Sequence, residues 1–318
     1  MTAAVDAHGI RKKYGSLVAV DDLTFAAEAG EILGVLGPNG AGKTTAIRVL
    51  TTILAPTHGT FTVAGIPHTR PTEIRRRIGV LPESAGYPER QTGEEYLRYH
   101  ARLFGRSRVG ARAVAEALLE EVGLFDRRRS LIGSYSRGMR QRLGIARALV
   151  NEPHVVFLDE PTLGLDPAGQ RQVLATVRRI ARERGATVLL STHLLAEVEE
   201  ICARVLILNH GRVIAQGSVS EVARRAAAPR SGRLRVPAEH VQQAIEALVG
   251  SPGVERAEPA DGQAGWLSVT LVPSDGRAGE ERMNDGLRAV VDAGVPLLSF
   301  ELEGARLSDA FLAMTEAA

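Results

Sequence analysis

The sequence contains a single cysteine, Cys202, so no intramolecular disulfide can form. One cysteine also excludes a metal site built from several thiolates. Cys202 follows a helical pattern, and we expect it to be packed inside the protein. Lysine is scarce too, because arginine supplies all but three of the 39 basic residues. We interpret that bias mainly as the mark of a GC-rich coding sequence, and we expect most arginines to be ordinary surface residues.

Long apolar runs are missing as well. No window approaches the roughly 18 continuous apolar residues that would cross a bilayer, and residues 1–7 lack the basic flank and apolar core of a signal peptide. The formal net charge of +2 is too small to indicate nucleic-acid binding. The composition therefore predicts a soluble, cytoplasmic globular protein, and any role at a membrane requires a partner.

The stretch Gly37–Thr45 fits the phosphate-loop pattern G-x-x-x-x-G-K-[ST] at every fixed position. The apolar run 32–36 before it predicts a buried strand, and residues 46–50 after it predict a helix. In such a loop, backbone N–H groups surround phosphates at the helix N-terminus, a Lys reaches the β- and γ-phosphates, and a Ser or Thr hydroxyl ligates Mg²⁺. Here these side chains are Lys43 and Thr44. We expect ATP to be contacted by Gly37, Pro38, Asn39, Gly40, Ala41, Gly42, Lys43, Thr44 and Thr45.

Short apolar strands alternate with helices along most of the chain. Because each strand is continuously apolar, the pattern indicates an α/β fold with a mostly parallel sheet covered on both faces. Helical periodicity from about residue 92 to 128 interrupts the strands and predicts a helical subdomain of about residues 84–150. We expect this P-loop NTPase domain to span residues 1–225. Its later strands are predicted at residues 59–63, 78–81, 155–158, 187–190 and 205–208.

The composition changes at residues 223–232, where Arg, Ala, Pro, Ser and Gly predict a linker at about 226–232. Beyond it, residues 233–318 show the order strand–helix–strand–strand–helix–strand, which is the order of a ferredoxin-like α+β unit. A last helix is predicted at 307–314. This part contains no nucleophile–base pair and no cluster of metal ligands in sequence, so we expect an accessory or regulatory role.

Two adjacent carboxylates, Asp159 and Glu160, follow the apolar run 155–158. The carboxyl end of a parallel strand is where such sheets bind ligands. Asp159 is placed to hold Mg²⁺, and Glu160 is placed to polarise the water that attacks the γ-phosphate.

Ser136 and Gly138 precede another predicted helix. A serine N-cap and a glycine at a helix N-terminus leave N–H groups free to bind an anion. Taken alone, this pattern is more typical of a plain capped helix than of an anion site.

The order of these motifs resembles the nucleotide-binding subunit of ABC transporters over about residues 5–225. The motifs that carry the resemblance are Tyr14, Gly37–Thr45, Ser136–Gly138, Asp159–Glu160, Leu165–Asp166 and His193. The resemblance implies that Tyr14 stacks on adenine, that residues 161–166 run along a dimer seam, and that His193 contacts the γ-phosphate. It also implies a homodimer in which each ATP lies between one phosphate loop and the partner's Ser136 and Gly138. ATP-driven closure and opening of that dimer would move an integral membrane permease.

Two positions depart from the family pattern. Glu83 stands where a glutamine is usual; it can still ligate Mg²⁺, but it adds negative charge beside the triphosphate. The signature segment reads Tyr-Ser-Arg-Gly-Met at residues 135–139 instead of Leu-Ser-Gly-Gly-Gln. Both changes, and the ending at residues 307–315, are similar to the ABC-2 type export branch, especially to ATPase subunits of the daunorubicin-resistance type.

We therefore expect an ATP-hydrolysing subunit of a drug or antibiotic exporter, peripheral to the cytoplasmic face of the membrane. Alternatives are a soluble ABC ATPase acting on ribosomes or DNA, a subunit exporting lipid or polysaccharide, and a nucleotide-binding module whose hydrolysis Glu83 weakens. We expect no nucleic-acid partner. The transported compound is not encoded in these motifs, because its path lies in the permease.

Overall fold

The computed structural model describes residues 3–226, 231–260, 263–272, 279–303 and 307–316. The chain divides into two compact units, Met1–Val219 and Ser220–Ala318. Each unit has a hydrophobic core of its own. Among the described residues, no helix is both long enough and apolar enough to cross a bilayer.

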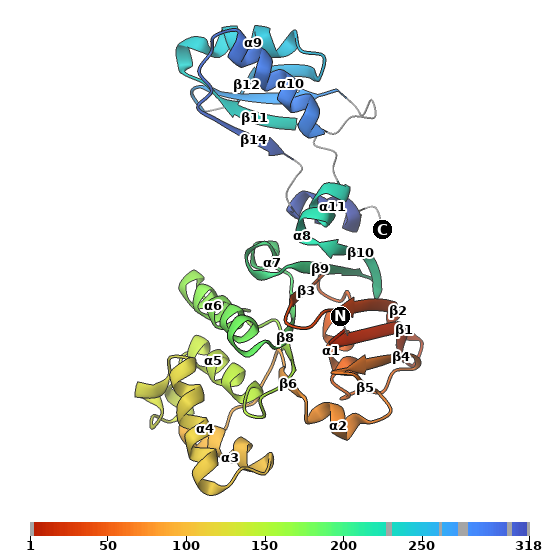
Figure 1. Cartoon of the computed structure of the whole chain (residues 1–318), viewed down its shortest axis with the longest axis vertical. Coiled ribbons are helices and arrows are strands. Elements are labelled where there is room, and N and C mark those ends of the chain that lie inside the picture. Colours follow the sequence, from red (N-terminus) through yellow and green to blue (C-terminus); the bar gives the residue numbers. More distant parts are fainter. Residues whose placement is uncertain (1–2, 227–230, 261–262, 273–278, 304–306, 317–318) are drawn as a thin grey trace. The chain divides into compact units, whose positions relative to one another are not determined.

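A six-stranded sheet forms the centre of the first unit (Figure 1). Its strand order is β10-β9-β3-β8-β7-β6, and every neighbouring pair is parallel except β10 with β9. The prediction of a mostly parallel sheet is therefore confirmed. The strands are β3 (Ile32–Leu36), β6 (Ile78–Leu81), β7 (Val155–Asp159), β8 (Thr187–Thr192), β9 (Arg204–Asn209) and β10 (Arg212–Ser218).

A second, antiparallel sheet in this unit has the order β2-β1-β4-β5. The sequence predicts strands in this region but not that they form a sheet of their own, because β1 pairs with β4 across more than forty intervening residues. The strands are β1 (Val5–Tyr14), β2 (Leu17–Ala27), β4 (His58–Val63) and β5 (Ile66–Pro67).

Both faces of the parallel sheet are buried. Val155 and Phe157 of β7 share a core with the antiparallel sheet and α1 (Lys43–Leu50), whereas Val156 and Leu158 share a core with α5 and α6 on the other face. Successive strand residues point to opposite faces, so both sets must be apolar. This is why the strands appear in the sequence as continuous apolar runs.

The stretch of helical periodicity contains α3 (Gly93–Leu103) and α4 (Arg108–Glu121). A capping box starts α3: the Thr92 hydroxyl accepts a hydrogen bond from the Glu95 N–H at 3.2 Å, and the Glu95 carboxylate accepts one from the Thr92 N–H at 2.9 Å. Short 3₁₀ helices follow at Phe125–Arg127 and Ile132–Ser134. The other helices of this unit are α2 (Pro71–Arg75), α5 (Arg137–Ala148), α6 (Pro167–Arg184) and α7 (Leu195–Ile201).

The second unit contains a four-stranded antiparallel sheet with the order β12-β13-β11-β14. Leu234 and Val269 from the sheet share one core with Ala244 of α9 and Val290 of α10, so both helices pack on the same face. The elements are α8 (Val219–Ala226), β11 (Ser231–Arg235), a 3₁₀ helix (Ala238–His240), α9 (Val241–Val249), β12 (Val254–Pro259), β13 (Trp266–Leu271), α10 (Gly279–Asp292), β14 (Ser299–Glu303) and α11 (Leu307–Glu316).

The predicted linker at 226–232 overlaps elements at both of its ends, because α8 ends at Ala226 and β11 begins at Ser231. Its central residues, 227–230, lie outside the described residues.

A chain shortened to residues 1–226 should fold without the rest of the protein, because the first unit has its own core. Trp266 is the only tryptophan and lies in the second unit, so its fluorescence follows that unit alone. In the full chain, an unfolding transition that circular dichroism detects and Trp266 fluorescence does not is that of the first unit. We expect circular dichroism of the shortened chain to show a cooperative thermal transition within about 4 °C of it. An insoluble or unfolded shortened chain would show that the first unit depends on the second.

Candidate functional site

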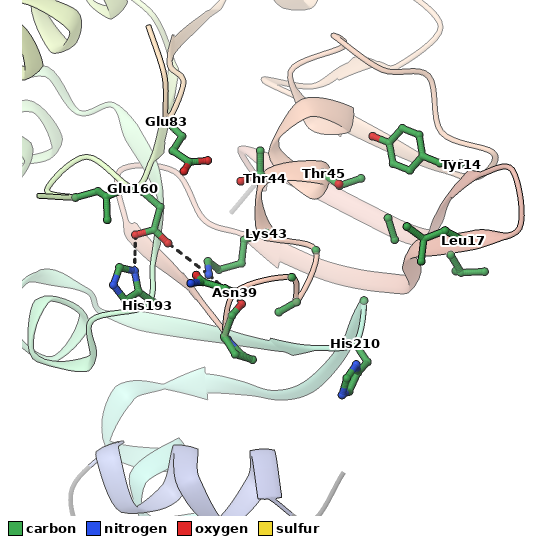
Figure 2. A pocket seen from close by; sticks show the side chains of 18 residues that line it. Tyr14, Leu17, Asn39, Lys43, Thr44, Thr45, Glu83, Glu160, His193 and His210 are labelled. Atoms are coloured by element: carbon green, nitrogen blue, oxygen red, sulfur yellow. Dashed lines mark hydrogen bonds and ion pairs between the residues drawn. The ribbon is translucent and has the colours of Figure 1, made fainter.

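A cavity of about 690 Å³ lies at the carboxyl ends of β3, β7 and β8 (Figure 2). Parallel α/β sheets place their ligands at this edge. Residues that are far apart in the sequence meet here, in agreement with the predicted nucleotide site. The predicted residues that line the cavity are Tyr14, Pro38, Asn39, Gly40, Ala41, Gly42, Lys43, Thr44, Thr45, Glu83, Glu160 and His193.

The phosphate loop between β3 and α1 depends on two glycines with positive φ. Gly40 has φ +83° and Gly42, the N-cap of α1, has φ +101°. A β-carbon on Gly42 would also lie 2.5 Å from the carbonyl oxygen of Ala19 in β2. Glycine is therefore required at 42 both by its backbone angle and by the close approach of a neighbouring strand.

The ammonium group of Lys43 is buried, with only 6% of the residue exposed. Its Nζ donates hydrogen bonds to the carbonyl oxygens of Gly37 at 2.7 Å and Pro38 at 3.2 Å. It also forms an ion pair with Oε1 of Glu160 at 3.4 Å (Figure 2). Lys43 thus holds the loop and the end of β7 together, at the centre of the cavity.

Glu160 is held from both sides, because its Oε2 lies 2.8 Å from Nδ1 of His193. Its backbone has φ +49°, a left-handed conformation that non-glycine residues rarely adopt. The Glu160 N–H compensates by donating to Ser191, both to the carbonyl oxygen and to the hydroxyl, each at 3.1 Å. The unusual backbone turns the carboxylate into the cavity, between Lys43 and His193.

Thr44 and Asp159 meet beside this pair. The Thr44 hydroxyl donates to Oδ1 of Asp159 at 3.2 Å, and the Ser191 hydroxyl donates to the same oxygen at 2.5 Å. Burial raises the pKa of the Asp159 carboxyl above its ordinary value, although both hydroxyl donors act in the opposite direction.

Burial makes ionisation of this carboxyl group unfavourable, and a cation placed beside it would favour the ionised form. Thr44, Asp159 and Glu83 offer oxygen atoms, the ligands that Mg²⁺ prefers. No group of three or more His, Cys, Asp or Glu residues that could hold a metal occurs in the described part of the chain.

Tyr14, the last residue of β1, lies at the opposite end of the cavity from His193 (Figure 2). It is 42% exposed, and the Lys12 ammonium lies 5.5 Å from its ring centroid. The ring is therefore free to stack on a planar ligand.

Ser136 and Gly138 do not line this cavity. Ser136 caps α5, where its hydroxyl accepts a hydrogen bond from the Met139 N–H at 3.2 Å. The structure therefore shows the capped helix that the sequence predicts, with its N-terminus outside the cavity of the same chain. No acidic residue occupies the first turn of α5.

Several groups at the site were not predicted. The Ser191 hydroxyl donates to the Asp159 carboxylate and accepts from the Glu160 N–H. Glu197, only 4% exposed, accepts a hydrogen bond from the Thr192 hydroxyl at 2.8 Å. Burial raises the pKa of Glu197. Nothing in the run 195–201 distinguishes the buried Glu197 from its exposed acidic neighbours. The other unpredicted residues that line the cavity are Leu17, Val18, Ala19, Leu163, His210 and Gly211.

Comparisons with known proteins agree with this geometry. Residues 20–163 match the family described as ABC transporter. The chain is 39% identical to the daunorubicin/doxorubicin resistance ATP-binding protein DrrA of Streptomyces peucetius, over 99% of this chain and 93% of that protein. It is 40% identical to the Nod factor export ATP-binding protein I of Burkholderia orbicola, over 68% of this chain and 71% of that protein.

Solved structures show the same fold. The structure of an ATP-binding subunit of an ABC transporter matches with a TM-score of 0.63 and 33% identity, covering 70% of this chain and 93% of that chain. The dimeric structure of a bacterial ABC transporter cassette matches with a TM-score of 0.62 and 24% identity, covering 67% and 98% respectively.

Replacing Asp159 with asparagine should stabilise the ligand-free protein by about 1 kcal/mol at pH 7. Asparagine removes a buried charge, and its carbonyl oxygen can still accept from Thr44 and Ser191. Folding raises the pKa of Asp159, so the folded state holds the proton more tightly than the unfolded chain does. The free energy of unfolding therefore falls as the pH rises from the ordinary pKa of Asp through the raised one. Thermal unfolding should therefore show the gain shrinking at acidic pH.

The control for this experiment is Asp126→Asn, which changes an exposed carboxylate and should leave the midpoint of unfolding unchanged. A lower midpoint for Asp159→Asn would show that the ionised carboxylate stabilises the ligand-free fold.

Proposed function

The chain belongs to the ABC transporter family of ATP-binding proteins, and on this basis we propose that it hydrolyses ATP to drive export of drugs or antibiotics through a separately encoded permease. The main support is the relative from Streptomyces peucetius, whose alignment spans 99% of this chain and so includes the second unit. The Nod factor relative matches only 68% of the chain. Export of a lipid-linked or saccharide compound is therefore the second candidate.

We propose that ATP occupies the cavity with its adenine on Tyr14 and its phosphates in the loop 37–45. Lys43 would exchange its contacts with Glu160 and with the loop carbonyls for the β- and γ-phosphates. The apolar wall at Leu17 and Val18 supports a base rather than a charged group at the Tyr14 end. The cavity volume of about 690 Å³ is in the usual range for sites of this ligand size.

We propose that Thr44 and Asp159 hold Mg²⁺, with Glu83 as a further oxygen ligand. When bound, the ion neutralises charge that develops on the phosphate oxygens. The raised pKa of Asp159 supports this role, because the buried carboxylate lacks a cationic partner of its own.

Glu160 is proposed as the group that polarises the attacking water, and His193 as its positioning partner and γ-phosphate contact. Lys43 blocks one carboxylate oxygen in the ligand-free protein. Once Lys43 binds phosphate, that oxygen can accept a hydrogen bond from water, while His193 holds the other at 2.8 Å. Binding of ATP thereby prepares the base.

Ser136 and Gly138 lie outside the cavity, which supports a site completed by a second copy of the chain. We propose a homodimer in which α5 of one subunit directs its N-terminus at the phosphates in the other. The absence of acidic residues from the first turn of α5 suits this contact. The dimer would act on an integral membrane permease from the cytoplasmic side.

For the domain organisation, we propose an ATP-binding domain at 1–225 with a helical subdomain at about 84–150, a linker at 226–232 and an accessory domain at 233–318. The strand order β12-β13-β11-β14, with both helices on one face, supports a ferredoxin-like fold for that domain.

Replacing Glu160 with glutamine should lower kcat by at least about 100-fold, because glutamine cannot polarise the water. ATP should bind about fivefold more tightly, equivalent to about 1 kcal/mol, because Lys43 no longer has an ionic partner to leave. Size-exclusion chromatography with ATP and Mg²⁺ should show a persistent dimer.

Glu120→Gln makes the same chemical change on the exposed side of α4 and should behave as wild type. A Glu160→Gln protein with normal turnover would rule out Glu160 as the base. Weaker ATP binding would rule out competition between Glu160 and phosphate for Lys43.

The export proposal is tested in a drug-sensitive bacterial host that expresses this chain together with the permease encoded beside it. We expect cells that express the pair to retain less doxorubicin than cells without it. Cells that express the pair with Lys43→Ala should retain as much as cells without it. Retention that is unchanged by an active, correctly assembled pair would reject drug export and favour the second candidate.

A further inference from the structure

Arg137 lies against the loop that follows Glu160. A β-carbon placed on Gly164 would lie 2.5 Å from Cζ and 2.9 Å from Nη2 of Arg137. Because the central carbon and a terminal nitrogen are at similar distances, the guanidinium covers the Gly164 backbone with its face. Arg137 is the first residue of α5, in the segment where the family pattern has glycine.

Gly164 belongs to a short ordered loop between Glu160 and α6. The Leu163 N–H donates to the Glu160 carbonyl at 3.2 Å, and the Leu165 N–H donates to the Thr162 carbonyl at 3.1 Å. Asp166 then caps α6 by accepting from the Gly169 N–H at 3.2 Å. A displacement of this loop would therefore be transmitted to the backbone of Glu160.

The same two segments also approach each other one residue further along each of them. A β-carbon on Gly138 would lie 3.9 Å from Cδ2 of Leu165, an ordinary van der Waals distance. Leu165 is also packed against the core that includes residues of α5 and α6. Arg137 therefore packs on the loop at Gly164, and the neighbouring Leu165 side chain lies close to Gly138.

The charge of Arg137 is not paired within the subunit. None of the residues that the structure describes forms a hydrogen bond or an ion pair with its guanidinium, and Arg137 is exposed. The contact with Gly164 therefore rests on van der Waals packing of a planar group against the backbone. Such a contact depends on the loop conformation and breaks at little cost, which suits an element that must respond to ligand binding.

We propose that Arg137 is a positioning residue that couples the N-terminus of α5 to the loop 161–166 and through it to Glu160 of the same subunit. This inference rests on the proposed function, in which α5 contacts the nucleotide of one site while Glu160 serves the other. The occupancy of one site would then adjust the water-polarising carboxylate of the second. The flat face of the guanidinium, and not only its charge, carries the coupling.

The test compares wild type with Arg137→Ala and Arg137→Lys in the full-length protein. Without nucleotide, hydrogen exchange in a peptide spanning residues 160–170 should be at least about threefold faster in both variants, because the loop loses the guanidinium that packs on Gly164. With ATP and Mg²⁺, kcat should fall by about two- to thirty-fold, the usual range for residues that carry coupling between sites. The Kd for ATP of the monomer, measured at protein concentrations too low for dimer formation, should stay within about twofold of wild type, because Arg137 does not line the cavity of its own chain.

Arg171→Ala is the matched control, since it removes an exposed arginine from the first half of α6, close in sequence to the loop. It should match wild type in exchange, kcat and Kd. Restoration of kcat by Arg137→Lys would overturn the proposal, because it would show that the charge alone matters. Unchanged exchange in the 160–170 peptide of Arg137→Ala would overturn it as well.

The two levels of inference fail in different ways. A wild-type protein without ATPase activity would reject the proposed function and the coupling that depends on it. An active wild type with an equally active Arg137→Ala variant would reject the coupling alone.

Discussion

The register of three buried parallel strands is the constraint on which the site depends. Leu36 of β3 pairs with Thr192 of β8, and Asp159 of β7 pairs with Ser191. The phosphate loop, the carboxylate pair and His193 therefore leave the sheet at one edge. Because side chains alternate between faces, a one-residue shift in β7 would turn Asp159 and Glu160 away from Lys43. Packing on both faces prevents that shift, so the apolar cores maintain the polar site.

The site gathers several buried ionisable side chains, which are stable there only if ion pairs or hydrogen bonds compensate their charge. Lys43, Asp159, Glu160 and Glu197 are each less than about one-tenth exposed. Lys43 and Glu160 satisfy each other, whereas Asp159 relies on two hydroxyl donors and keeps a raised pKa. Burial without full pairing costs stability. Asp159 is therefore the member of this group whose ionised form is least compensated by its surroundings.

The contact between the N-terminus of α5 and the loop after Glu160 lies outside the cavity and offers a physical link between two nucleotide sites. The N-terminal residues of α5 do not line the cavity of their own chain, but Arg137 packs against the loop that follows Glu160. One short segment can therefore combine a role at a neighbouring nucleotide with an effect on its own glutamate. The substitution of arginine for glycine in this segment adds a planar, unpaired cation at that junction.

The sequence alone determined the phosphate-loop pattern, the alternation of apolar strands with helices, and the choice of Lys43, Thr44, Asp159 and Glu160 as candidates, because these depend on local pattern and spacing. It could not determine that the antiparallel strands form a separate sheet, since their partners are distant in the chain. It also could not distinguish the buried Glu197 from its neighbours, or show that Ser191 bonds both the Asp159 carboxylate and the Glu160 backbone. Only the tertiary structure decided these points, because burial and hydrogen bonding arise from segments that packing alone brings together.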